Sequence, residues 1–233
     1  MSAYKNFIQD FPARCEKLLD RIERGNKFDD KKVTGLLLVA SSAVCIPYDR
    51  LRPVSNETMP HPSGDTEKYS IAARQFQQLW NSNIVGSRLC PKEERQNWLF
   101  TKLDDVQGDP DGWQTDFKEI SKDKKVSSFL KIMRNALAHG NIYTKGSQSI
   151  AQILFVSSEP DRKKCLTCGT TRSATIKHYN CLAVTPDAFE QFLKHWFEFI
   201  KELEIPPVIY NDIEGENKYA AMPNRSSLSL EIR

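Results

Sequence analysis

Apolar residues recur at helical spacing along most of the chain. This periodicity predicts helices over residues 4–23, 30–44, 65–83, 98–103 and 121–140. Residues 33–46 are apolar on nearly every side, which predicts a helix at the centre of a bundle. Residues 47–64 contain four prolines, and this composition predicts a long loop after the central helix.

The pattern changes after residue 148. Residues 149–158 and 173–185 predict two strands of a long hairpin, because a polar connection containing glycine separates them. A last helix is predicted from residue 186, since Thr185 suits an N-cap and Pro186 suits the first helical position. Its apolar stripe consists of Phe189, Phe192, Leu193, Trp196, Ile200 and Leu203.

The predicted fold class is therefore all-α, a bundle of about five or six helices with a β-hairpin inserted at about 149–185. We expect one domain over residues 1–205, including the hairpin, and a partly flexible C-terminal extension over residues 206–233.

Composition narrows the class of protein. Hydrophobic residues make up 39% and charged residues 27% of 233 residues, so the chain can bury a core. The formal net charge of +3 permits an anionic partner without requiring one. The charged N-terminus lacks the apolar run of a signal peptide, and residues 33–46 are too few to span a bilayer, so no membrane partner is expected. The six cysteines do not resemble a secreted disulfide framework, which favours the cytoplasm.

Polar residues gather on one side of the helix predicted over 121–140. A helical wheel groups the apolar residues Val126, Phe129, Leu130, Met133, Ala136 and Leu137 into one core-facing stripe. The other side carries Lys124, Ser128, Lys131, Asn135 and His139, with Arg134 at its flank and no acidic residue after Asp123. Gly140 and Asn141 suit a left-handed cap.

These polar residues have two interpretations. An ordinary solvated helix face has the same composition, because exposed charges on helices are common. If they form a site, the residues of one helix alone would be too far apart to make a compact one, since Arg134 and His139 lie about 140° apart around the helix axis. Two copies related by a two-fold axis would make a tighter site.

The motif "RNALAH" in this helix resembles the HEPN superfamily, in particular its plasmid- and defence-associated bacterial members. It is an R-x4-H motif with a polar residue directly after the arginine, late in an amphipathic helix and before Gly-Asn. The resemblance implies an HEPN-like helical bundle and a metal-independent endoribonuclease that works as a homodimer. It also implies that Arg134 and His139 are catalytic and that Asn135 supports them.

The chemistry of RNA cleavage fits these residue types. RNA supplies its own 2′-OH nucleophile, a histidine transfers protons near neutral pH, and an arginine holds a phosphate through two hydrogen bonds. Lys131 and Lys124 are expected to attract the RNA backbone. The expected products are a 2′,3′-cyclic phosphate and a 5′-hydroxyl, and no cofactor is required.

The resemblance leaves two functions open. One is a toxin or antiviral defence effector, with an antitoxin or a nucleotidyltransferase as a candidate partner. The other is a non-catalytic binding module in a defence or regulatory complex, since some superfamily members only bind nucleotides or other proteins. Such members usually lack the arginine or the histidine, and this chain has both.

The cysteines near the hairpin form a Cys-x2-Cys-x9-His-x2-Cys pattern of Cys165, Cys168, His178 and Cys181. These ligand types suit a tetrahedral structural zinc site, and a zinc-stabilised adaptor is a third hypothesis. However, His178 and Cys181 are three apart in a predicted strand, so they point to opposite faces unless a bulge intervenes. Two unlinked thiols at the hairpin tip are the alternative interpretation.

Overall fold

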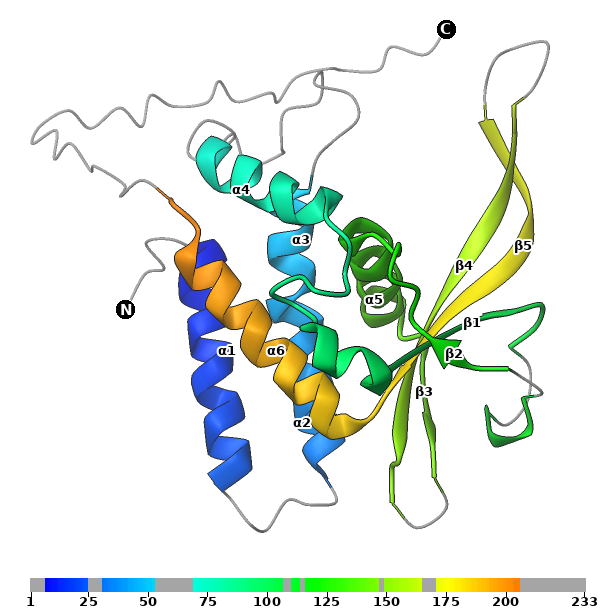
Figure 1. The fold of residues 1–233 in the computed structure, drawn as a ribbon, viewed down its shortest axis with the longest axis horizontal. Coiled ribbons are helices and arrows are strands. Elements are labelled where there is room, and N and C mark those ends of the chain that lie inside the picture. Colours follow the sequence, from blue (N-terminus) through cyan, green and yellow to red (C-terminus); the bar gives the residue numbers. More distant parts are fainter. Residues whose placement is uncertain are drawn as a thin grey trace, which may run out of the picture.

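Six α-helices and a five-stranded antiparallel sheet make up the part of the chain that the computed structural model describes (Figure 1). The described residues are 7–24, 31–52, 69–106, 110–113, 116–146, 149–164 and 171–205. The helices gather on one face of the sheet, and α5 lies between the sheet and the other helices. The predicted boundary between a domain at 1–205 and an extension at 206–233 stays a prediction, because 206–233 lies outside the described residues.

The predicted long helices are confirmed, with shifted ends. The observed helices are α1 (Phe7–Arg24), α2 (Lys32–Ala43), α3 (Cys45–Leu51), α4 (Ser70–Asn81), α5 (Val126–His139) and α6 (Pro186–Glu202). Helix α3 begins just before the predicted loop and runs into it. Its proline, Pro47, lies in the first helical turn, where a missing backbone N–H breaks no intrahelical hydrogen bond.

Helices α2 and α3 follow each other with only Val44 between them. Together they form the one helical segment of the described chain, Lys32–Leu51, that is long and apolar enough to cross a membrane. This segment is longer than the apolar run at 33–46. In the fold, 56% of its most apolar 18-residue stretch is buried, and the core helix of a protein can have the same length and composition.

The prediction of an all-α fold is wrong. The sheet has the strand order β2-β1-β5-β4-β3. Its strands are β1 (Trp98–Leu103), β2 (Lys118–Glu119), β3 (Ile142–Lys145), β4 (Gln152–Lys164) and β5 (Thr171–Val184). The predicted hairpin is confirmed as β4–β5, but it is the centre of this sheet rather than an isolated insertion. The fold is mixed α/β with a helical core.

Strand β1 was expected to be a helix, and its pairing explains the difference. It pairs antiparallel with β5, from Trp98 opposite Val184 to Leu103 opposite Tyr179. Trp98 faces the helices, whereas Leu99 faces a smaller apolar cluster on the outer side of the sheet. Because both faces of the strand are covered, its apolar residues do not alternate with polar ones.

Aromatic packing joins the sheet to α5 and α6. Trp98 of β1 is fully buried, and its ring centroid lies 4.7 Å from that of Phe129 and 5.6 Å from that of Phe192. On β4, the ring of Phe155 packs against that of Phe189 on α6, with 5.0 Å between the ring centroids. This packing fixes α5 on the sheet, and the polar end of α5 is therefore held in place by the core.

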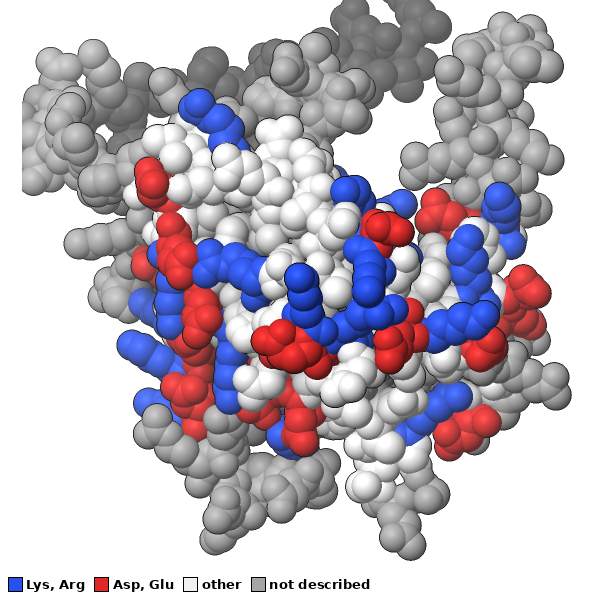
Figure 2. All heavy atoms as spheres, viewed as in Figure 1, with Lys and Arg blue, Asp and Glu red and all other residues white. Residues whose placement is uncertain are grey.

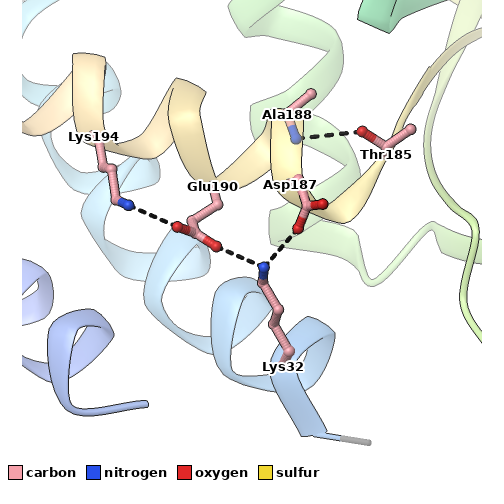
Figure 3. A network of polar contacts seen from close by, with 6 residues as sticks. All are labelled: Lys32, Thr185, Asp187, Ala188, Glu190 and Lys194. Carbon is pink, nitrogen blue, oxygen red and sulfur yellow. Dashed lines mark hydrogen bonds and ion pairs between the residues drawn. The ribbon is translucent and has the colours of Figure 1, made fainter. Parts of the chain in front are cut away.

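A network of lysines and carboxylates ties the start of α6 to α2 (Figure 3). The predicted cap is confirmed, since the backbone N–H of Ala188 donates to the Thr185 hydroxyl at 3.3 Å. The buried carboxylate of Glu190 lies 2.8 Å from the Lys32 ammonium and 2.7 Å from that of Lys194. Glu190 therefore links two helices from a position that water barely reaches.

Replacing Glu190 with alanine is expected to lower the free energy of unfolding by about 2 kcal/mol, because two charge-assisted hydrogen bonds to a buried group are lost. Urea denaturation measures this change. The matched control is Asp187→Ala, which removes a carboxylate that also contacts Lys32 but is 87% exposed. It is expected to cost less than about 1 kcal/mol. Equal losses for both variants would contradict a special role for the buried carboxylate.

Candidate functional site

Helix α5 divides into an apolar and a polar side as predicted. All six residues of the predicted apolar stripe are buried, and Ile132 is buried with them. The helix ends at His139, and Gly140 has the left-handed φ of 70°. The N–H of Gly140 donates to the carbonyl of Ala136 and closes the last turn. The predicted left-handed cap is confirmed, and it leaves His139 exposed on the final turn.

Arg134 faces helix α3 and is about three-quarters covered. Its Nη2 lies 2.9 Å from Oδ2 of Asp49, which forms an ion pair between α5 and α3. The hydrogen bond to Asp49 raises the pKa of Arg134, so the guanidinium stays charged. Arg134 Nε and Asp49 Oδ1 are buried and have no hydrogen-bond partner among the described residues. Two unpaired polar atoms thus lie on the two groups that form this ion pair.

Asn135 connects Arg134 to the sheet. Its Oδ1 accepts a hydrogen bond from Arg134 Nη1 at 3.4 Å, and its Nδ2 donates to the hydroxyl of Ser157 on β4 at 3.1 Å. In the described part of the chain, the side chain of His139 makes no hydrogen bond or ion pair. The structure therefore brings the side chains of Arg134 and Asn135 together and leaves the imidazole of His139 unbonded to either.

Acidic residues from other segments reach the polar side of α5. The helix itself has no acidic residue, but Asp49 of α3 pairs with Arg134, and Glu159 of β4 lies 3.7 Å from the ammonium of Lys131. Figure 2 shows basic and acidic side chains interspersed over the visible face. The segment that forms the polar side of α5 therefore contains no acidic residue, but the fold places two carboxylates beside it. Neither carboxylate belongs to a motif, and no sequence signal marks them as partners of α5.

Lys124 lies just before α5 and turns toward the sheet. Its ammonium nitrogen is 3.4 Å from the ring centroid of Phe100 on β1. Burial and, to a smaller extent, the positive charge of Lys102 lower the pKa of Lys124 to about 8, against the opposing effect of Glu159. Lys124 is thus partly desolvated, whereas Lys131 is an exposed lysine paired with Glu159.

The predicted zinc ligands are only partly within the described residues. Cys165 and Cys168 lie outside them. The Cys181 thiol is fully buried in the outer apolar cluster, and burial raises its pKa to about 12. His178 lies on the opposite face of β5, beside α5. Within the described ranges, no three His, Cys, Asp or Glu side chains converge as a metal site. The zinc site stays a prediction.

Comparison with known protein families gives a match over most of the chain. A family model described as HEPN pEK499 p136 matches residues 1–206, a range that contains every residue the structure describes. No curated protein and no solved structure matches the chain.

Proposed function

Because the chain belongs to the HEPN pEK499 p136 family, we propose that it is a metal-independent endoribonuclease whose catalytic residues are Arg134 and His139. HEPN domains are generally ribonucleases, and the family match supports a nuclease or HEPN-module function. The observation that carries the finer proposal is the end of α5. There a charged, hydrogen-bonded Arg134 and an exposed, unbonded His139 share the last two turns.

The proposed reaction is attack of a ribose 2′-OH on the adjacent phosphorus. His139 removes the proton of the 2′-OH, and the bond to the 5′-oxygen of the next nucleotide breaks. The leaving 5′-oxygen takes a proton from a second acid, which yields a 2′,3′-cyclic phosphate and a 5′-hydroxyl. Arg134 holds the phosphate oxygens as charge develops on them, and Asn135 keeps the guanidinium oriented.

The second acid is the reason to propose a homodimer. Cleavage needs one group that accepts a proton and one that donates a proton, and each chain offers one histidine in this motif. A two-fold axis along the exposed ends of two α5 helices would bring two copies of His139 to one phosphate. We therefore propose a cytoplasmic homodimer that acts on RNA as a toxin or antiviral effector. Its proposed partner is an antitoxin or a nucleotidyltransferase.

The His139→Ala variant tests the proposal in an RNA-cleavage assay that detects the cyclic phosphate product. Its rate is expected to fall by at least about 100-fold, because proton transfer by a positioned histidine contributes that much or more. Gln191→Ala, at an exposed position of α6, is the control and should cleave at the wild-type rate. Wild-type protein that leaves RNA intact would refute the enzyme, and a fully active His139→Ala variant would refute the role of His139.

A second candidate function is a non-catalytic binding module. The observation that favours it is the Arg134–Asp49 ion pair, which gives Arg134 a structural task without any chemistry. In that case, replacing Arg134 or Asp49 with alanine would lower the stability of the protein by the same amount and would have no other effect. The comparison of these two positions separates the two functions.

A further inference from the structure

A pocket of about 390 Å³ lies between α5 and the face of the sheet that α5 covers. Its lining comes from four segments: β1, the turn before α5, α5 itself, and the β4–β5 pair beside it (Figure 1). The polar lining includes Lys102, Lys124, Ser128, Lys131, Glu159 and His178. None of these residues belongs to the R-x4-H motif, so the pocket is separate from the proposed catalytic residues.

The pocket carries an excess of positive charge. Three lysines line it from three different segments, and Glu159 is its one carboxylate. Glu159 is already engaged, because Lys131 lies 3.7 Å from it and the Asn180 amide donates to it at 3.4 Å. Neither Lys102 nor Lys124 has a carboxylate within ion-pair distance among the described residues. Two ammonium groups therefore share a concave site in which neither forms a direct ion pair with a described carboxylate.

Holding these two charges close together costs free energy. Lys124 is partly buried, and the charge of Lys102 acts on it, which together hold its pKa near 8. A desolvated lysine beside another cation is the kind of perturbed group that marks ligand sites. Ser128 and His178 also line the pocket, and their side chains make no hydrogen bond within the described ranges, so they have donors to offer. An anion with several acceptor oxygens satisfies all four groups.

We propose that this pocket binds the phosphate group of a nucleotide, either free or within an RNA strand. Lys102 and Lys124 supply the positive charge, and Ser128 and His178 supply hydrogen-bond donors. Phosphate fits because it is anionic and accepts several hydrogen bonds at once.

The geometry favours an RNA strand that extends from the pocket to the R-x4-H motif. This inference rests on the proposed function. The pocket wall includes Ser157, whose hydroxyl accepts the hydrogen bond from Asn135. Ser128 and His139 are separated by about 16 Å along the helix, at about 1.5 Å per residue. A stacked strand rises about 3.4 Å per nucleotide, so about five nucleotides span this length. The pocket would then hold the backbone a few nucleotides from the cleaved bond.

Binding of a labelled single-stranded RNA oligonucleotide to the His139→Ala protein tests the proposal, because this background separates binding from cleavage. Lys102→Gln and Lys124→Gln in that background are each expected to weaken binding about fivefold or more and to reduce its salt dependence. Lys118→Gln is the matched control, since it removes an exposed lysine of β2 outside the pocket, and it should bind as the parent does. The Lys124→Gln variant loses the contact with Phe100 and could unfold for that reason. Lys102 is exposed, so the Lys102→Gln variant still tests the pocket in that case.

The same measurement with ATP and with inorganic phosphate identifies the source of the phosphate group. Binding of ATP that falls in both pocket variants assigns the pocket to a free nucleotide, and binding of RNA alone that falls in both assigns it to a strand. Either result supports the site. No binding of any probe, unchanged binding in both variants, or an equal loss in Lys118→Gln overturns it. Pocket-dependent binding by wild-type protein that never cleaves RNA would refute only the enzyme.

The pH dependence of binding gives a second readout. Affinity is expected to fall as the pH rises from about 7 to about 9, because Lys124 loses its proton near pH 8. The charged and titratable groups facing it are Lys102 on β1, Lys131 on α5, Glu159 on β4 and His178 on β5. The fall should be largely absent in Lys124→Gln. A fall of the same size in that variant would contradict the part assigned to Lys124.

Discussion

Replacing Arg134 with alanine is expected to lower the rate of RNA cleavage by about 100-fold to 1000-fold, whereas Asp49→Ala should stay within about tenfold of wild type. Arg134 is the proposed donor to the phosphate oxygens, so its loss removes stabilisation of the transition state. Asp49 pairs with Arg134 at 2.9 Å and is assigned as a positioning residue, because it is not proposed to contact the phosphate. Single-turnover cleavage with protein in excess measures both effects on the chemical step.

Two further variants sharpen this comparison. Arg134→Lys keeps the charge but loses the two-pronged hydrogen bond, and it should recover only part of the activity. Arg52→Ala removes an exposed arginine at the end of α3 and should be fully active. Both partners of the pair are partly exposed, so each alanine variant is expected to lower the free energy of unfolding by about 1 kcal/mol. Equal losses of cleavage activity in Arg134→Ala and Asp49→Ala would contradict the assignment of Arg134 as the donor to the phosphate oxygens.

Replacing Trp98 with alanine is expected to lower the free energy of unfolding by about 3 to 5 kcal/mol. The side chain is fully buried between Phe129 of α5 and Phe192 of α6, so the substitution opens a cavity where the sheet meets both helices. Guanidinium denaturation measures the loss. Because Phe129 belongs to α5, the variant is also expected to cleave RNA more slowly at temperatures where it remains folded.

Trp113 provides the matched control for this substitution. It is a partly exposed tryptophan on the smaller outer cluster, and Trp113→Ala is expected to cost less than half as much. Trp98→Phe should cost less than about 1.5 kcal/mol, because the Trp98 Nε1–H is buried without a partner among the described residues. A larger loss for Trp113→Ala than for Trp98→Ala would contradict the place of β1 in the core.

The parts of the fold that the sequence predicts are those with local causes. Helices α5 and α6 have a clear apolar stripe and a recognisable terminus, Gly140 for α5 and Thr185 for α6. Strand β1 has no such local signal, since its residues are apolar on both faces and its main partner β5 lies far along the chain. Helix α3 was not predicted, because a proline such as Pro47 usually indicates a loop. Only the structure shows that Pro47 lies in the first turn of a helix, where a proline is tolerated.

The candidate site divides in the same way. The polar side of α5 and its cap follow from the spacing of residues along one helix. Asp49 and Glu159 do not, because tertiary packing brings them from α3 and β4 to Arg134 and Lys131. The pocket was also beyond prediction. Lys124 and Lys131 were expected to meet RNA, but Lys102 belongs to a strand that the sequence did not predict.

The backbone directly after α5 has little conformational freedom. The N–H of Asn141 donates to the carbonyl of Ala136, and the carbonyl of Asn141 accepts from the N–H of Val156 on the inner strand β4. Strand β3 begins at the next residue, so the backbone that follows His139 is tied to the helix and to the sheet at once. The proposed catalytic imidazole therefore explores its own side-chain rotamers and little else. Much of the conformational entropy of arranging it is already lost when the protein folds, and does not have to be lost again at each encounter with RNA.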